Sequence, residues 1–122
     1  MNDALIIDDN RSTADALQQM LMVLDINARV AYGASPAMSL LSGFTPGLIL
    51  LDINMPGVDG LEILAYLRRE PRLIPIPVIV ITSDDQPETR ARVMKGGATA
   101  MIIKPATLES LEENLKKIGI IN

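Results

Sequence analysis

Short apolar runs alternate with amphipathic segments along the whole sequence, and this alternation leaves the chain few folds. The apolar runs cover residues 5–7, 48–51, 78–81 and 101–103, with a weaker run at 28–32. Continuous apolar runs of strand length are typical of strands that are buried on both faces, as in parallel sheets. The intervening segments, for example 14–24 and 108–118, place apolar residues at helical spacing. The sequence therefore predicts five strands, each followed by a helix.

Proline and glycine mark several of the predicted helix boundaries. Ser35 reads as an N-cap before Pro36 at the first helical position, and Gly43 reads as the end of that helix. A further helix is expected over 61–69, and Pro87 opens another that ends near Gly96. Because strands separated by helices need crossover connections, the prediction is a (βα)5 α/β fold, a doubly wound parallel sheet with helices on both faces.

Length and composition exclude several classes of protein. The 122 residues suit one domain with a substantial core. The sequence has no cysteine and no histidine. Disulfides, thiolate or imidazole metal sites and Ser-His-Asp triads are therefore excluded, and any chemistry must use carboxylates, hydroxyls, lysine, arginine or backbone groups.

Charge and hydropathy bear on location and partners. The net charge is −4 and only three residues are aromatic, so we expect no direct contact with nucleic acid, which favours a basic face and stacking rings. The N-terminus lacks the basic region of a signal peptide, and the apolar runs are far shorter than a membrane helix needs. We therefore expect a cytoplasmic protein that does not bind membranes.

Polar residues follow four of the five apolar runs, where parallel strands would end. These residues are Asp8 and Asp9, then Asp52, Thr82 and Lys104. In open α/β sheets the ligand crevice lies outside the carboxyl ends of the strands. An aspartate after a strand is often only a helix cap or a turn residue. Independent caps, however, need not select two acids, a third acid, a hydroxyl and a lysine, so we expect these groups to converge on one pocket.

The charges of such a pocket indicate its chemistry. Two unit charges about 5 Å apart repel by roughly 3 kcal/mol at an effective dielectric constant near 20, so three carboxylates need counter-charge. Lys104 supplies one positive charge, and a hard divalent cation such as Mg²⁺ suits the oxygen ligands. A carboxylate beside Mg²⁺ and an ammonium group can accept a phosphoryl group, whose developing charge both cations stabilise.

The motifs around these residues resemble the receiver domain of two-component response regulators, the family that includes the bacterial chemotaxis regulators. The resemblance extends over nearly the whole chain, from Ala4 to about Ile118. It is carried by an ordered set of motifs: Ile7-Asp8-Asp9-Asn10, Leu51-Asp52-Ile53-Asn54-Met55-Pro56-Gly57-Val58-Asp59-Gly60, Ile81-Thr82-Ser83 and Ile103-Lys104-Pro105. An acidic pair alone would be weak evidence, whereas this set at these spacings is specific.

The resemblance implies a role for each matching residue. Asp52 would be the phosphoacceptor, which takes a phosphoryl group from a phosphohistidine of a sensor kinase or a phosphotransfer protein. Asp9 and Asp52 would bind Mg²⁺ through carboxylates, Asn54 through its backbone carbonyl and Asp8 through a metal-bound water. Thr82 would donate a hydrogen bond to a phosphoryl oxygen. Lys104 would pair first with the acceptor carboxylate and then with the phosphate.

The family also implies the strand order 2-1-3-4-5, a cis Lys104-Pro105 bond and an output surface formed by the fourth helix, the fifth strand and the fifth helix. That surface would include parts of 90–95, Met101 and 108–116, and a homodimer could form through it. The family usually has an aromatic residue where this chain has Met101, and its ring moves inward on phosphorylation. Methionine is an ordinary core filler, although it could still change rotamer, so the sequence leaves open whether this chain keeps the usual switch.

Two other functions stay open at this point. A phosphatase of the haloacid-dehalogenase type also uses a nucleophilic Asp, a Thr, a Lys and Mg²⁺, but it needs a second Asp where this chain has Asn54, and a cap domain. A pseudo-receiver would bind partners without phosphorylation. We expect a signalling domain rather than an enzyme, with residues 1–122 forming a single receiver domain and no effector domain in this chain. The chain would then be a single-domain regulator or a piece of a longer protein.

Overall fold

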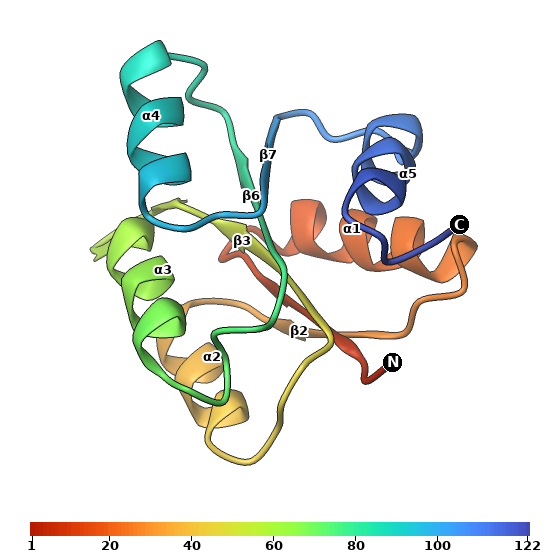
Figure 1. The fold of residues 1–122 in the computed structure, drawn as a ribbon, viewed down its shortest axis with the longest axis horizontal. Coiled ribbons are helices and arrows are strands. Elements are labelled where there is room, and N and C mark those ends of the chain that lie inside the picture. Colours follow the sequence, from red (N-terminus) through yellow and green to blue (C-terminus); the bar gives the residue numbers. More distant parts are fainter.

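Five parallel strands form one sheet, in the order β2-β1-β3-β6-β7 (Figure 1). The computed structural model describes residues 1–122, apart from the side chain of residue 58. The strands of the sheet are β1 (Ala4–Ile7), β2 (Ala28–Ala31), β3 (Leu48–Asp52), β6 (Val78–Thr82) and β7 (Ala100–Ile103). Each begins within two residues of a predicted apolar run, and the order is the predicted 2-1-3-4-5, counted over these five strands.

Helices cover both faces of the sheet, as the sequence predicts (Figure 1). Helices α1 and α5 lie on one face, and α2, α3 and α4 lie on the other. Their bounds are α1 (Arg11–Val23), α2 (Ala34–Leu41), α3 (Gly60–Arg69), α4 (Pro87–Lys95) and α5 (Leu108–Lys117). In the described part of the chain, no helix combines the length and the apolar character that a membrane crossing requires.

Alternation along each strand divides the core into two layers. In β3, Ile49 and Leu51 pack with the α2, α3 and α4 layer, whereas Leu48 and Leu50 pack with the α1 and α5 layer. All four side chains are at most 1% exposed. Because strand side chains point alternately to opposite faces, a strand covered on both sides must be apolar throughout. This requirement explains the continuous apolar runs in the sequence.

The helix ends follow the predicted boundaries with one exception. Asn10 caps α1 by accepting a hydrogen bond from the Thr13 backbone N–H at 2.9 Å, and Pro87 is the first residue of α4. The prediction of Ser35 as the N-cap of α2 is wrong. Gly33 caps this helix with a φ of 142°, a conformation that favours glycine, so α2 begins one residue before Ser35.

A small antiparallel pair interrupts the connection from β3 to α3. Strands β4 (Asn54–Met55) and β5 (Val58–Asp59) flank the Pro56-Gly57 turn. Asp59 then caps α3 by accepting from the Leu61 backbone N–H at 2.9 Å. Gly60 lies so close to Ile53 that a Cβ atom would come within 2.2 Å of the Ile53 Cα. The glycine therefore allows the loop to pack against the end of β3.

Arg68, near the end of α3, binds the α3–β6 connection and the turn after α4, which lie at the edge of the sheet where β6 and β7 begin. Its guanidinium donates to the backbone carbonyls of Gly97 at 2.9 Å, Ile74 at 3.0 Å and Ile76 at 2.8 Å. Partial burial lowers the pKa of Arg68 from its ordinary value. One side chain thus joins the α3–β6 connection to the turn that follows α4.

Candidate functional site

Three aspartates meet at the carboxyl edge of the sheet, as their positions after neighbouring strands predict. Asp8 and Asp9 follow β1, and Asp52 is the last residue of β3, which pairs with β1. Their carboxylates offer oxygen atoms that all lie within 4.8 Å of one another. Asp8 is 1% exposed and Asp52 is 4% exposed, whereas Asp9 is exposed. Two of the three charges are therefore held away from bulk water.

Lys104 reaches this cluster from the end of β7. Its Nζ lies 3.5 Å from Asp8 Oδ2 and 3.4 Å from Asp52 Oδ2. The Lys104-Pro105 peptide bond is cis, as the resemblance implies. One ammonium group thus neutralises part of the charge on two buried carboxylates, and the site keeps a formal excess of two negative charges (three carboxylates less one ammonium).

Backbone N–H groups hold the two buried carboxylates in place. Asn10 N donates to Asp8 Oδ1 at 2.9 Å, and Asn54 N donates to Asp52 Oδ1 at 2.9 Å. Burial raises the pKa of Asp8 above its usual value, and the Asp52 carboxylate adds to the rise. The Asn10 N–H and the Lys104 charge act in the opposite direction without cancelling it. Ionisation of the Asp8 carboxyl is therefore less favourable in the folded protein than in the unfolded chain.

Thr82, the last residue of β6, is fully buried beside the acidic cluster. Its hydroxyl donates a hydrogen bond to the side-chain oxygen of Asn54 and accepts one from the Asp84 backbone N–H at 3.1 Å. Asn54 therefore contacts two of the predicted site residues, Asp52 through its backbone and Thr82 through its side chain. The structure brings together all six residues that the sequence predicted for this site.

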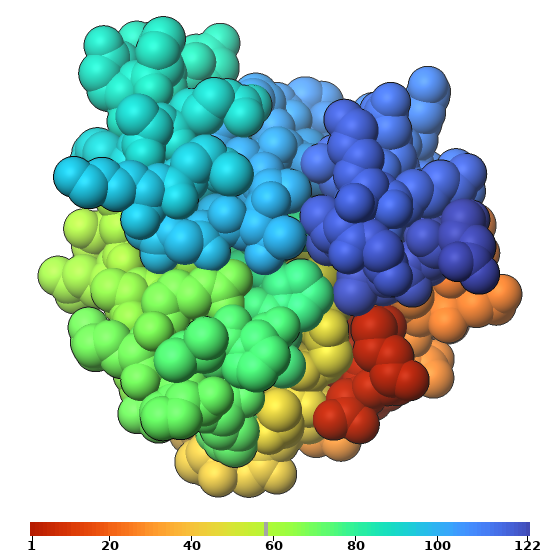
Figure 2. Space-filling view, in the orientation of Figure 1, coloured from red at the N-terminus to blue at the C-terminus, as the bar shows by residue number. Residues whose placement is uncertain are grey.

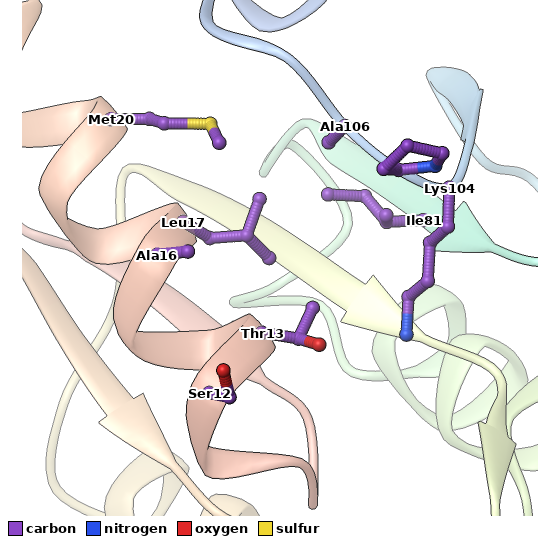
Figure 3. A pocket seen from close by; sticks show the side chains of 9 residues that line it. Ser12, Thr13, Ala16, Leu17, Met20, Ile81, Lys104 and Ala106 are labelled. Atoms are coloured by element: carbon purple, nitrogen blue, oxygen red, sulfur yellow. The ribbon is translucent and has the colours of Figure 1, made fainter.

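An apolar cleft of about 430 Å³ adjoins the site on the side of α1 (Figure 3). Ser12 and Thr13 lie near Lys104 at one end, and Met20 and Ala106 lie at the other. Lys104 lines this cleft while its ammonium contacts the carboxylates, so the cleft and the acidic cluster share one side chain. The cleft has no signal in the sequence, because it depends on how closely α1 approaches the β7–α5 connection.

Two polar residues beyond the predicted set also bear on the site. Asp84 follows β6, and its Oδ2 accepts a hydrogen bond from Thr89 Oγ1 of α4 at 2.6 Å. Thr89 is 9% exposed. The pairing of Asp84 with Thr89 was not predicted, although an acid five residues before a threonine at the start of a predicted helix was the available signal.

Met101 is 8% exposed and packs in the core layer that contains α2, α3 and α4. Its neighbours in that layer include Val93 of α4 and Val80 of β6, with which it is paired in register. The expectation that this methionine fills the core is confirmed.

The fold belongs to the flavodoxin-like class of doubly wound α/β domains, with its acidic cluster at the carboxyl edge of the sheet. Comparison with known proteins narrows the class. The family model described as the response regulator receiver domain matches residues 4–116. The chain belongs to this family, whose members are signalling domains of two-component systems that interact with histidine kinases and effectors.

The chain is also similar to individual proteins and solved structures. An uncharacterized 14.6 kDa protein in the sodA1 3′ region of Leptolyngbya boryana is 33% identical over 103 residues, which cover 84% of this chain and 79% of that protein. The signal receiver domain of a DNA binding response regulator protein (merR) from Colwellia psychrerythraea 34H is 29% identical, with a TM-score of 0.90 over 99% of this chain and all of that chain. The chemotaxis protein CheY4 of Vibrio cholerae shares the fold, at 24% identity and a TM-score of 0.89 over 97% of this chain and 98% of that chain.

Proposed function

We propose that this receiver domain accepts a phosphoryl group on Asp52 from a phosphohistidine of a sensor kinase or a phosphotransfer protein. The observation that carries the proposal is the contact of one ammonium group, on Lys104, with two buried carboxylates that belong to a cluster of three. Such an arrangement concentrates charge that a core residue or a helix cap would not need. Asp52 lies at its centre, with one carboxylate oxygen bound to Lys104 and the other to a backbone N–H.

The site also suits Mg²⁺. Its formal excess of two negative charges would be neutralised by one divalent cation, and carboxylate and carbonyl oxygens are the ligands that magnesium prefers. We propose Asp9 and Asp52 as carboxylate ligands, the backbone carbonyl of Asn54 as a third ligand and Asp8 as a partner through a bound water. When bound, the ion would offset the charge that develops on the transferring phosphoryl group.

Asp52, Lys104 and Thr82 would each have a separate role in phosphoryl transfer. The Asp52 carboxylate attacks phosphorus, the bond from phosphorus to the imidazole nitrogen breaks, and the imidazole leaves with that electron pair. Lys104 stays beside the phosphoryl oxygens and balances their charge. The Thr82 hydroxyl donates a hydrogen bond to one of those oxygens, for which it must release the Asn54 side chain.

The apolar cleft beside Lys104 gives the protein donor a surface to cover. A phosphohistidine that reaches Asp52 past Lys104 brings the surrounding surface of its protein over the adjoining space between α1 and Ala106. We therefore propose that the donor packs an apolar side chain into this cleft. Ala16→Arg should slow transfer from a phosphohistidine protein at least tenfold and leave modification by acetyl phosphate, which needs no such contact, within a factor of two.

The test of the proposed function is covalent modification. Incubation with acetyl phosphate and Mg²⁺ should add one phosphoryl group, about 80 Da, as expected for an aspartyl phosphate. Asp52→Asn should abolish the added mass, and omission of Mg²⁺ should reduce it. Modification of Asp52→Asn to the extent of the wild type would overturn the assignment. Absence of any adduct on the wild type would favour a pseudo-receiver, and repeated turnover of p-nitrophenyl phosphate would favour a phosphatase.

We further propose that phosphorylation alters the surface made by α4, β7 and α5, which Figure 2 shows together on one face. Helix α4 carries the exposed basic residues Arg90, Arg92 and Lys95. Helix α5 carries the exposed acidic residues Glu109 and Glu113. Opposite charges on the two helices would suit a second copy of the chain turned by a two-fold axis. The homodimer, cytoplasmic placement and the single-domain organisation of residues 1–122 stay predictions.

A further inference from the structure

A chain of hydrogen bonds leads from the acceptor site to helix α4. The Thr82 hydroxyl donates to the Asn54 side-chain oxygen and accepts from the Asp84 backbone N–H at 3.1 Å. The Asp84 carboxylate in turn accepts from Thr89 Oγ1 at 2.6 Å and from Gln86 N at 2.9 Å. Each residue thus contacts the next, from the strand end that carries Thr82 to the first turn of α4.

The part of this hydrogen-bond series nearest α4, from Asp84 to Thr89, is firmly held. Both oxygens of the Asp84 carboxylate have a donor, one from Thr89 and one from the backbone that precedes α4. The Thr89 hydrogen bond, followed by that of Gln86, lowers the pKa of Asp84. The bond from Thr89 is therefore directed at an ionised acceptor, which makes it stronger than a bond between neutral groups. A displacement of Asp84 must then displace the start of α4 or break this bond.

The part nearest the acceptor site can rearrange, because Thr82 has only one hydroxyl proton. In this structure the Thr82 hydroxyl uses that proton in the hydrogen bond that it donates to the Asn54 side-chain oxygen. A hydrogen bond from Thr82 to a phosphoryl oxygen on Asp52 requires the hydroxyl to leave Asn54 and turn toward the acceptor. The Asp84 N–H, which donates to the same hydroxyl oxygen, must follow the movement or lose its partner.

Met101, which stands where the family has its aromatic residue, is not an exposed side chain that could move into the core. Met101 is already buried in the core layer that also contains Val93 of α4. A residue that fills the core in the unmodified protein cannot report phosphorylation by moving from solvent into the core. The hydrogen bonds through Asp84 connect Thr82 to α4 in addition to the backbone of residues 83–86.

We propose that Thr89 is a positioning residue that passes the movement of Thr82 to helix α4 through the Asp84 carboxylate. The inference rests on the proposed function, since it needs a phosphoryl group or its analogue on Asp52. It goes beyond that function by naming the contact that couples the acceptor site to the output surface in a receiver domain without an aromatic residue at position 101.

The test is amide NMR of the full chain with and without beryllofluoride and Mg²⁺. Wild type, Thr89→Val and Thr89→Ala, which lack the hydroxyl, and Thr89→Ser, which keeps it, are compared. In all four proteins the resonances of residues 52–54 and 82 should respond alike. The shifts that beryllofluoride induces in residues 90–95 should fall to less than half of the wild-type values in Thr89→Val and Thr89→Ala, and Thr89→Ser should restore them.

A purely structural role for Thr89 predicts a different pattern. It would alter the α4 resonances before beryllofluoride is added and leave the induced change intact. An induced response of α4 at wild-type size in either folded variant that lacks the hydroxyl overturns the inference, as does failure of Thr89→Ser to restore it. A wild-type protein whose residues 52–54 do not respond at all overturns the proposed function itself, and the inference falls with it.

Discussion

Asp9→Asn should stabilise the metal-free protein, although most substitutions destabilise. Asp9 is the exposed member of the acidic cluster, and Lys104 contacts the other two carboxylates rather than this one. The substitution keeps the size of the side chain and removes one negative charge that lies close to two others. It therefore relieves repulsion without breaking an ion pair of the structure.

The magnitude follows from the spacing of the carboxylates. At 4.8 Å, the upper limit for the oxygens of the cluster, two unit charges repel by about 0.9 kcal/mol in water and about 3.5 kcal/mol at an effective dielectric constant near 20. Because Asp9 is exposed, the lower value applies, and two neighbouring carboxylates give about 2 kcal/mol, which the nearby Lys104 charge and screening by salt both reduce. We expect a gain of about 1 kcal/mol in the free energy of unfolding, against a usual loss of about 1 kcal/mol.

Urea denaturation at low ionic strength measures this difference, first in EDTA and then in MgCl₂. In EDTA the variant should unfold at a higher urea concentration than the wild type, with the same dependence on urea. At a Mg²⁺ concentration tenfold above its dissociation constant the wild type should gain about 1.4 kcal/mol, and Asp9→Asn should gain less. Asp85→Asn, a change at an exposed carboxylate outside the cluster, is the control. A variant that is less stable than the wild type in EDTA would refute the electrostatic argument.

Three further substitutions test the charges and the hydrogen bonds of the structure. Lys104→Met should destabilise the metal-free protein by about 3 kcal/mol in urea denaturation, because it leaves two buried carboxylates without their counter-charge. In the folded protein the pKa of Asp8 lies above its ordinary value of 3.8. Between the ordinary pKa and the folded pKa, the folded protein therefore binds more protons at Asp8 than the unfolded chain does. The stability contributed at Asp8 therefore falls as pH rises above 3.8, and the stability of metal-free Asp8→Asn relative to wild type should increase as the pH rises above that value. Arg68→Met should cost about 2 kcal/mol by thermal or urea unfolding, since several backbone carbonyls lose a charged donor. An unchanged free energy of unfolding would contradict the role given to Lys104 or Arg68, and a flat difference across pH would contradict that of Asp8.

The sheet and its site were predictable because both depend on features that local sequence carries. A strand covered on both faces must be apolar throughout, so β1, β3 and β6 appear as uninterrupted runs. The edge strand β2 is partly exposed, and its run is correspondingly weak. Once the strands are known to be parallel, residues that follow them must gather at one edge. Asp8, Asp52 and Lys104 were therefore predicted to converge before any distance was available.

The features that the sequence did not predict depend on contacts between distant segments or on backbone angles. The start of α2 is set by the φ of Gly33 rather than by the favourable Ser35-Pro36 pair. The hydrogen bond from Thr82 to Asn54 joins residues 28 positions apart, and no local pattern specifies it. The cleft beside Lys104 similarly reflects the packing of α1 against a connection more than 80 residues away.

The hydrogen bonds of Arg68 give the two ends of helix α4 unequal freedom. The turn after its C-terminal end is tied to α3 through the Gly97 carbonyl, and the same guanidinium holds the connection that leads into β6. At its N-terminal end, the Thr89 hydroxyl and the Gln86 backbone N–H both donate to Asp84, which lies in the connection from β6. We therefore expect a small displacement at Asp84 to turn α4 about its Gly97 end rather than to shift the whole helix. Amide hydrogen exchange should accordingly be slower in residues 96–99 than in residues 84–88, because the end of α4 that Arg68 holds opens less often than the end near Asp84.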